Sequence, residues 1–237
     1  MSAIAIANME QVTDVLNALK TSCVIEEKTP SSIIASNPTV LSEIYQKNIN
    51  MAIWKRTHSN ELASAVTCFI AENSVKPTRL TVSAGDAYDE LCKAFGDSHA
   101  ATIVSKDIAL LVDMFCCLFD LKNIGLRLAI LNAAMCPRFH VDRIPCRLIT
   151  TYQGLGTQWL AHDVVDRTKL GAGNQGKADE ESGLFYGLDK MNSLNEGDVA
   201  LLKGENWDDT TGFGLVHRSP LVPKGEKRLV LTLDFID

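Results

Sequence analysis

The chain lacks the features by which nucleic-acid-binding and membrane proteins are usually recognised. Its 237 residues include 23 basic and 29 acidic side chains, for a formal net charge of −6. Nucleic-acid binders usually show a basic excess or stripe, so we expect neither DNA nor RNA as a partner. The longest apolar run, 108–121, is interrupted by Asp113 and is too short to span a bilayer. The first eight residues lack the basic and apolar regions of a secretory signal, which predicts a cytoplasmic protein without membrane partners.

The motifs of several common enzyme classes are also missing. No Gly-x-Ser-x-Gly elbow occurs, and 154–156 lacks the third glycine of a dinucleotide fingerprint. The glycines of 169–177 are not followed by the Gly-Lys-Ser/Thr of a P-loop. The seven cysteines form no Cys-x-x-Cys pair, and their odd number favours free thiols in a reducing compartment. The sequence therefore gives no support for a serine hydrolase, a dinucleotide-binding enzyme, a P-loop nucleotide-binding protein or a Cys-x-x-Cys redox protein.

The hydrophobic pattern changes near residue 123, which predicts an α+β protein with two regions. The first, 1–123, is mainly helical, and we expect it to pack on the second. One short alternating stretch, 79–83, reads as a strand. Apolar residues repeat at helical spacing over five segments. These segments are 9–19, 38–53, 61–73, 86–95 and 98–121.

The second region, 124–237, has the pattern of short antiparallel strands, which is typical of a sandwich, a barrel or a jelly roll. A glycine-rich stretch, 171–187, is too long for an ordinary connection and is interpreted as a mobile lid. The predicted strands are 125–132, 146–152, 199–202 and 228–235.

The best candidate for chemistry is the motif His140-Val141-Asp142. On a strand, residues i and i+2 point to the same face, so the imidazole and the carboxylate would lie side by side. These two groups are two-thirds of the triad that binds non-haem Fe(II) and leaves coordination positions open. His217, beside another strand-like stretch, supplies a third candidate ligand. We therefore take His140, Asp142 and His217 as the candidate catalytic and metal-binding residues.

The order of these residues resembles that of the Fe(II)- and 2-oxoglutarate-dependent dioxygenases of the prolyl-hydroxylase type. In that pattern, a His-x-Asp motif is followed by a distant histidine and then by a basic residue, here Arg228. The Gly-Asp-apolar stretch 197–204 also matches the strand that precedes the distal histidine. The resemblance covers 124–237 and implies a double-stranded β-helix, or jelly roll.

The resemblance also implies roles for individual residues. His140, Asp142 and His217 would hold Fe(II), and 2-oxoglutarate would chelate the metal. Arg228 would anchor the far carboxylate of that small-molecule cosubstrate, because guanidinium grips a carboxylate with two parallel bonds. Further hydrogen bonds would come from Tyr152, Thr150 or Ser219.

A second resemblance covers more of the chain and names no activity. The stretches 136–142, 145–148, 154–160 and 48–54 are similar to a bacterial family of unknown function, DUF1826.

Two other hypotheses remain open at this stage. Cys136 and Cys146 flank the His-x-Asp motif, and thiolates with imidazole favour Zn(II), so the protein could be a zinc-binding protein of metal homeostasis without oxygenase activity. The third hypothesis is an interaction module that binds neither metal nor cosubstrate. The prime substrate and the oligomeric state are not indicated by the sequence.

Overall fold

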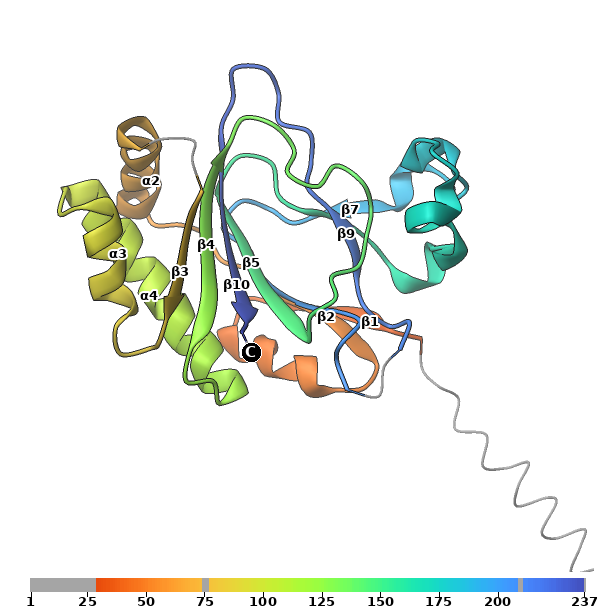
Figure 1. Cartoon of the computed structure of the whole chain (residues 1–237), viewed down its shortest axis with the longest axis horizontal. Coiled ribbons are helices and arrows are strands. Elements are labelled where there is room, and N and C mark those ends of the chain that lie inside the picture. The colour runs from red at the N-terminus through yellow and green to blue at the C-terminus, as the bar shows by residue number, and fades with distance from the viewer. Residues whose placement is uncertain (1–28, 74–76, 209–210, 237) are drawn as a thin grey trace, which may run out of the picture.

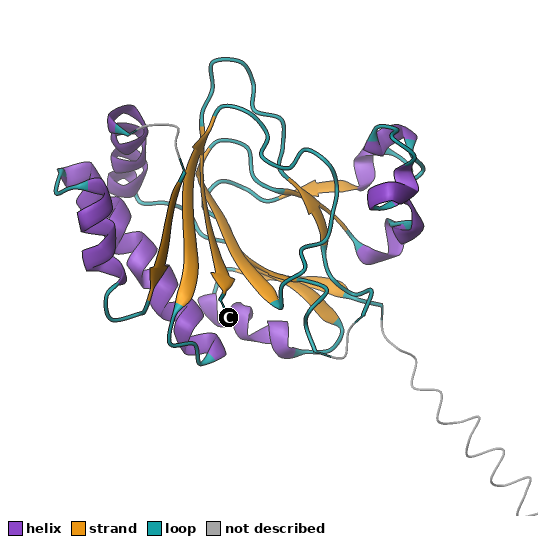
Figure 2. Ribbon diagram, viewed as in Figure 1, coloured by secondary structure: helices purple, strands orange, loops and turns teal. Residues whose placement is uncertain are grey.

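The computed structural model describes residues 29–73, 77–208 and 211–236, and the helix expected over 9–19 lies outside them. A seven-stranded sheet has the order β1-β2-β8-β5-β10-β4-β3, and a three-stranded sheet has the order β7-β6-β9. Figures 1 and 2 show helices α2, α3 and α4 on one side of the large sheet and the small sheet on the other side. This is the mixed helix-and-strand class that the sequence predicts.

The N-terminal region is less helical than expected. Residues 38–53 do not form one helix: a 3-10 helix, η1 (Pro38–Tyr45), is followed by strand β2 (Ile49–Trp54). All but the last residue of β2 are buried, because the strand is covered on both faces. A strand buried on both faces has a continuous apolar run, which cannot be told from a buried helix by periodicity alone.

Three strands from the first half of the chain belong to the large sheet. β1 (Ser31–Ala35) runs parallel to β2, and β2 pairs with β8. β3 (Thr78–Val82), which the sequence predicts, pairs with β4. Residues before and after 123 therefore share one sheet and one apolar core.

The helices predicted over 61–73, 86–95 and 98–121 form as expected. They are α2 (Asn60–Glu72), α3 (Ala87–Phe95) and α4 (His99–Phe119). Serine caps begin two of them: the Leu62 N–H donates to Ser59 Oγ, and the Ala101 N–H donates to Ser98 Oγ. Their apolar faces cover one side of the large sheet (Figure 2).

The strands predicted after residue 123 also form. They are β4 (Ile124–Leu131), β5 (Cys146–Gln153), β8 (Val199–Lys203) and β10 (Arg228–Phe235), and adjacent ones pair antiparallel. The small sheet consists of β6 (Gln158–Leu160), β7 (Met191–Ser193) and β9 (Val216–Arg218). Between β6 and β7 lie short 3-10 helices at His162–Val164, Arg167–Lys169, Gly171–Asn174, Asp179–Glu181 and Leu188–Lys190. The predicted lid, 171–187, lies within this segment, and its closure stays a prediction.

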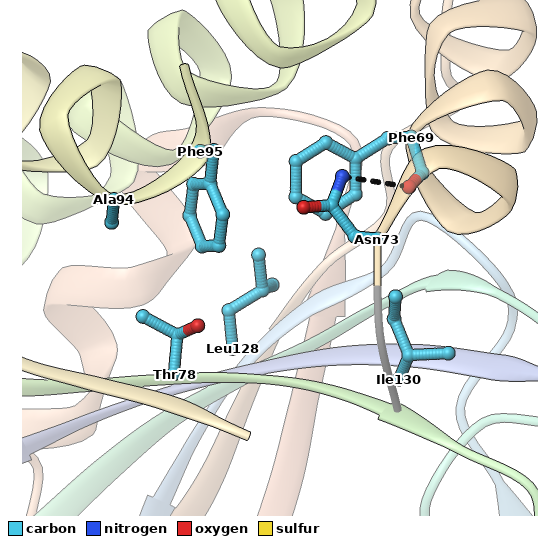
Figure 3. Close-up of a pocket in the computed structure, with 7 residues that line it drawn as sticks. All are labelled: Phe69, Asn73, Thr78, Ala94, Phe95, Leu128 and Ile130. Atoms are coloured by element: carbon cyan, nitrogen blue, oxygen red, sulfur yellow. Dashed lines mark hydrogen bonds between the residues drawn. The ribbon is translucent and has the colours of Figure 1, made fainter. Parts of the chain in front are cut away.

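The two faces of the large sheet have different surroundings. On β10, Leu229, Leu231 and Leu233 enter the core beneath the helices, and Val230 faces the small sheet. A pocket lies on the helix side, between Phe69, Phe95 and the sheet (Figure 3). Most of the residues that line it are apolar, and the only side-chain hydrogen bond drawn in it, from Asn73 to the Phe69 carbonyl, ends α2. Within the described residues, the group of potential metal ligands lies on the other face.

Within the described residues, no helix combines the length and the apolar character needed to cross a bilayer.

Candidate metal centre

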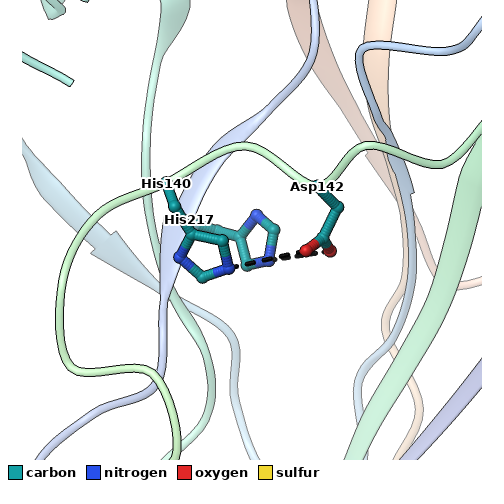
Figure 4. Close-up of side chains that lie close together, drawn as sticks. All are labelled: His140, Asp142 and His217. Atoms are coloured by element: carbon teal, nitrogen blue, oxygen red, sulfur yellow. Dashed lines mark ion pairs between the residues drawn. The ribbon is translucent and has the colours of Figure 1, made fainter. Parts of the chain in front are cut away.

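Two histidines and one carboxylate converge on the face of the large sheet opposite the helices. One ligand atom from each of His140, Asp142 and His217 lies within 4.8 Å of the other two. The Nε2 atom of His217 is 3.3 Å from one oxygen of Asp142, and that of His140 is 3.5 Å from the other. Figure 4 shows both rings turned toward this carboxylate. Within the described residues this is the only such group of three potential metal ligands.

Backbone pairing between two distant segments brings the histidines together. His140 and His217 exchange both backbone hydrogen bonds, at 3.0 Å each, as an isolated bridge. His217 lies on β9, whereas His140 and Asp142 lie in the irregular connection between β4 and β5. The predicted strand for the His-x-Asp motif is therefore reduced to this single bridge, although the side chains still share a face.

The ring orientations suit a metal ion. The His140 Nδ1 atom is 2.9 Å from the Arg138 carbonyl oxygen, and the His217 Nδ1 atom is 3.2 Å from the Leu215 carbonyl oxygen. A carbonyl only accepts, so each Nδ1 atom carries a hydrogen and each ring turns its Nε2 atom toward the carboxylate. When neutral, the two rings offer Nε2 lone pairs to a metal ion beside the carboxylate oxygens; when protonated, a ring donates its Nε2 hydrogen to Asp142 instead. Two imidazoles and one carboxylate are the donor set of the non-haem Fe(II) triad, so these residues fit that ion.

Arg147 holds the carboxylate in place. Its Nη1 atom is 2.6 Å from Asp142, while its Nε and Nη2 atoms donate to Asp234 at 2.7 and 2.9 Å. Burial by itself raises the pKa of the Asp142 carboxyl, but hydrogen bonds from the two imidazoles and the charge of Arg147 outweigh burial and hold that pKa well below its usual range. Hydrogen bonding to Asp142 likewise raises the pKa of His140, against the opposing effect of burial. The site therefore carries an ionised carboxylate and attracts positive charge.

A buried cation lies in the same cavity as the histidines. Arg228 is only 2% exposed, and its Nη atoms donate to the hydroxyls of Ser219, Thr151 and Thr157 at 3.1, 2.9 and 2.9 Å. Its Nε atom is buried without a hydrogen-bond partner, and it forms no ion pair with any described residue. Burial lowers the pKa of Arg228 to about 10. The cavity is lined by both histidines and by Arg228. A buried guanidinium without an acid partner fits a bound carboxylate.

Of the three neutral residues expected beside Arg228, the structure brings only Ser219 to it. Tyr152 lies on the opposite face of β5, where its hydroxyl donates to Asp107 of α4 at 2.7 Å. Thr150 is two residues away on the same strand and so shares that face. Arg228 donates instead to Thr151 and Thr157, which the sequence reasoning missed. Because side chains alternate along a strand, a shift of one residue exchanges the two faces.

The two flanking cysteines do not join the triad. Cys146 is buried on the helix side of β5, where burial raises the pKa of its thiol. Cys136 is exposed and contributes to the cavity lining. Neither sulfur belongs to the three-ligand group. The described residues thus do not assemble the thiol-rich site on which the zinc hypothesis depends.

Asp179 ties the segment of 3-10 helices to both histidine-bearing segments. This carboxylate is 3% exposed and accepts the Phe139 N–H at 2.8 Å. It also forms ion pairs with Arg138 at 2.9 Å and with Arg218 at 3.3 Å. Phe139 precedes His140 and Arg218 follows His217, so one buried carboxylate holds the neighbours of both candidate ligands. The sequence offered no signal for it beyond an acidic residue in a predicted loop.

Comparison with known proteins supports a family and a fold. A profile of the family described as "Protein of unknown function (DUF1826)" matches residues 35–234. A search of curated proteins finds no match. The rice dioxygenase for auxin oxidation is 12% identical, with a TM-score of 0.52 over 88% of this chain and 83% of that chain.

Two further solved structures match more loosely. The Arabidopsis thaliana dioxygenase for auxin oxidation, as a 2-oxoglutarate complex, is 10% identical, with a TM-score of 0.49 over 88% of this chain and 92% of that chain. A Pseudomonas putida prolyl-4-hydroxylase is 11% identical, with a TM-score of 0.43 over 87% of this chain and 96% of that chain. Identities this low concern the fold alone, and the similarity to the rice enzyme supports a large sheet of the jelly-roll type.

Proposed function

Because the chain belongs to the DUF1826 family, whose description names no activity, we propose from the site itself that it is a non-haem Fe(II)- and 2-oxoglutarate-dependent oxygenase. The observation that carries this proposal is a single cavity lined by both histidines of a His-Asp-His triad and by a buried arginine that forms no ion pair with a described residue.

Each residue has a distinct role in the proposal. His140, Asp142 and His217 hold the iron on one face and leave its other positions open. Arg228 binds the far carboxylate of 2-oxoglutarate, and three hydroxyls orient its guanidinium. When bound, the iron and the cosubstrate supply the chemistry that activates dioxygen and oxidises a substrate.

Other contacts preorganise the three metal ligands. Arg147 orients Asp142 and keeps it ionised, and the carbonyls of Arg138 and Leu215 fix the ring tautomers. Preorganised ligands lose little freedom when the metal binds, so this second layer of contacts raises affinity.

The test uses protein purified without oxygen and reconstituted with Fe(II). Addition of 2-oxoglutarate should produce the visible metal-to-ligand charge-transfer band of the chelate. The band should be lost in His140→Ala, and in Arg228→Ala it should require far more 2-oxoglutarate. His99→Ala removes an exposed histidine at the start of α4 and should leave the band unchanged.

One result would overturn the proposal. Stoichiometric tight zinc, with neither band nor 2-oxoglutarate binding in the Fe(II) sample, would make the protein a zinc-binding protein. A further loss of zinc in Cys136→Ser would then assign that thiol as a ligand.

A further inference from the structure

Two arginines face each other on the strands beside the candidate metal cavity. Arg79 of β3 is directly opposite Arg127 of β4, and Arg127 is directly opposite Thr232 of β10. Directly opposed residues of antiparallel strands lie on the same face of a sheet. Thr232 lines the cavity of the triad. Arg79 and Arg127 therefore extend the cavity face of the sheet toward its β3 edge.

No acidic side chain in the described part of the chain pairs directly with either arginine. Like charges directly opposite each other destabilise a sheet, and neither arginine forms an ion pair with a described residue. The nearest acid on β10, Asp234, is taken by two hydrogen bonds from Arg147. Arg147 also holds Asp142, so the acids of this face are already engaged.

The surroundings of Arg127 are those of a binding residue rather than a surface charge. Its Nε atom is buried and has no hydrogen-bond partner, although the residue as a whole is only partly buried. Burial lowers the pKa of Arg127, and the charges of Arg79 and Arg147 lower it further. A charge on an exposed edge strand can serve to prevent sheet-to-sheet association, which accounts for Arg79. It does not account for a guanidinium on the next strand inward whose Nε atom is buried without a hydrogen-bond partner.

We propose that Arg127, with Arg79 beside it, binds an oxyanion, a carboxylate or phosphate group, on the substrate that this site oxidises. Guanidinium is suited to this task because its fork of N–H donors matches the oxygens of both groups. The inference rests on the proposed oxygenase function and adds the chemical class of its substrate. It assigns separate anions to separate arginines: the cosubstrate carboxylate to the deeply buried Arg228, and the substrate anion to the partly exposed pair.

The probes are methylphosphonate and acetate, each added to protein loaded with Co(II) and saturated with 2-oxoglutarate, so that Arg228 is already occupied. Paramagnetic relaxation of the probe by Co(II), measured by nuclear magnetic resonance, reports binding near the metal. Arg127→Gln should weaken binding of the preferred probe at least about tenfold, since hydrogen bonds to charged groups are among the strongest. Arg79→Gln should weaken it less, because Arg79 is more exposed. Lys106→Gln, which removes one positive charge from the exposed side of α4, should change nothing.

The charge-transfer band of the Fe(II) protein separates failure of this inference from failure of the proposed function. Loss of probe binding in Arg127→Gln, with the band and the 2-oxoglutarate affinity at wild-type levels, supports the inference. A wild-type band without probe relaxation, or equal relaxation in Arg127→Gln, overturns the inference and leaves the function standing. Absence of the band in the wild type overturns both. The tighter of the two probes then indicates whether the substrate carries a phosphate or a carboxylate.

Discussion

Arg228 and Lys203 are two buried cations on opposite faces of the large sheet, each about 2% exposed and neither in an ion pair with a described residue. The Lys203 Nζ atom donates to the Gln46 carbonyl at 2.8 Å and lies 4.7 Å from the centre of the Trp207 ring. Arg228 is held by three hydroxyls, and its Nε atom is left without a partner. Only Arg228 lines a cavity that also contains potential metal ligands.

The difference shows that burial of a charge does not by itself mark a binding site. Burial lowers the pKa of both groups, to about 8 for Lys203 and to about 10 for Arg228. A perturbed pKa points to function only when geometry supports it. Lys203 is enclosed by a carbonyl and an aromatic face, so its surroundings are complete. The Nε–H of Arg228 has no hydrogen-bond acceptor and lies beside a cavity, so Arg228 can bind a ligand there.

The largest expected effect is that of Arg228→Met. The dissociation constant for 2-oxoglutarate in the Fe(II) protein should rise about 100-fold, because truncating one partner of a buried charge pair costs several kcal/mol. The melting temperature should change little, since removal of an uncompensated buried charge offsets the lost hydrogen bonds. Titration of the charge-transfer band and a thermal melt measure the two quantities. If the 2-oxoglutarate affinity is unchanged, Arg228 has only a structural role, like Lys203.

Arg147→Met tests a second cation on the cavity face of the sheet. Unlike Arg228, Arg147 forms ion pairs with acidic side chains. Fe(II) affinity should fall about 10- to 100-fold, the usual cost of removing a group that orients a metal ligand. The protein should also melt at a lower temperature, because Asp234 loses its partner. Competition with a chelator of known affinity measures the first effect. Asp234→Asn, which keeps the contact between Arg147 and Asp142, should lose much less iron affinity.

Asp179→Asn should lower the Fe(II) affinity by a smaller factor than Arg147→Met. The amide oxygen can still accept the Phe139 N–H, but the ion pairs with Arg138 and Arg218 are lost. We expect Fe(II) affinity to fall about fivefold, the upper range for a partly exposed ion pair. Limited proteolysis within 162–190 should also become faster. Glu180→Gln removes a neighbouring, more exposed partner of Arg218 and serves as the control; equal effects of the two variants would contradict a special role for Asp179.

Lys203→Met should affect stability alone. The pKa of Lys203 falls from 10.5 to about 8 on folding, so between these values the unfolded chain binds more protons than the folded protein. The free energy of unfolding should therefore rise with pH across this window in the wild type, and the variant should lack this contribution. Urea unfolding at about pH 7.5 and about pH 10, compared between the two proteins, measures it. A change in 2-oxoglutarate affinity would show that the two buried cations are coupled.

Local sequence patterns were sufficient to locate most of the helices and strands. Helical periodicity located α2, α3 and α4, alternation located β4 and β5, and strand-like apolar runs located β8 and β10. The same periodicity was wrong for β2, which is buried on both faces and so has no alternating pattern. Its partners, β1 and β8, come from segments far apart in the sequence.

The sequence by itself determined which residues are available for the site: a His-x-Asp motif, a later histidine and an arginine eleven residues beyond it. Only the tertiary structure decided their surroundings. The pairing of β5 with β10, which includes a register shift between Leu229 and Val230, turns Thr151 toward Arg228 and places Thr150, Tyr152 and Cys146 on the opposite face. The contacts of Arg147 and Asp179 likewise join residues between 5 and 87 positions apart. Such choices depend on which strands meet and in which register, and no local pattern carries that information.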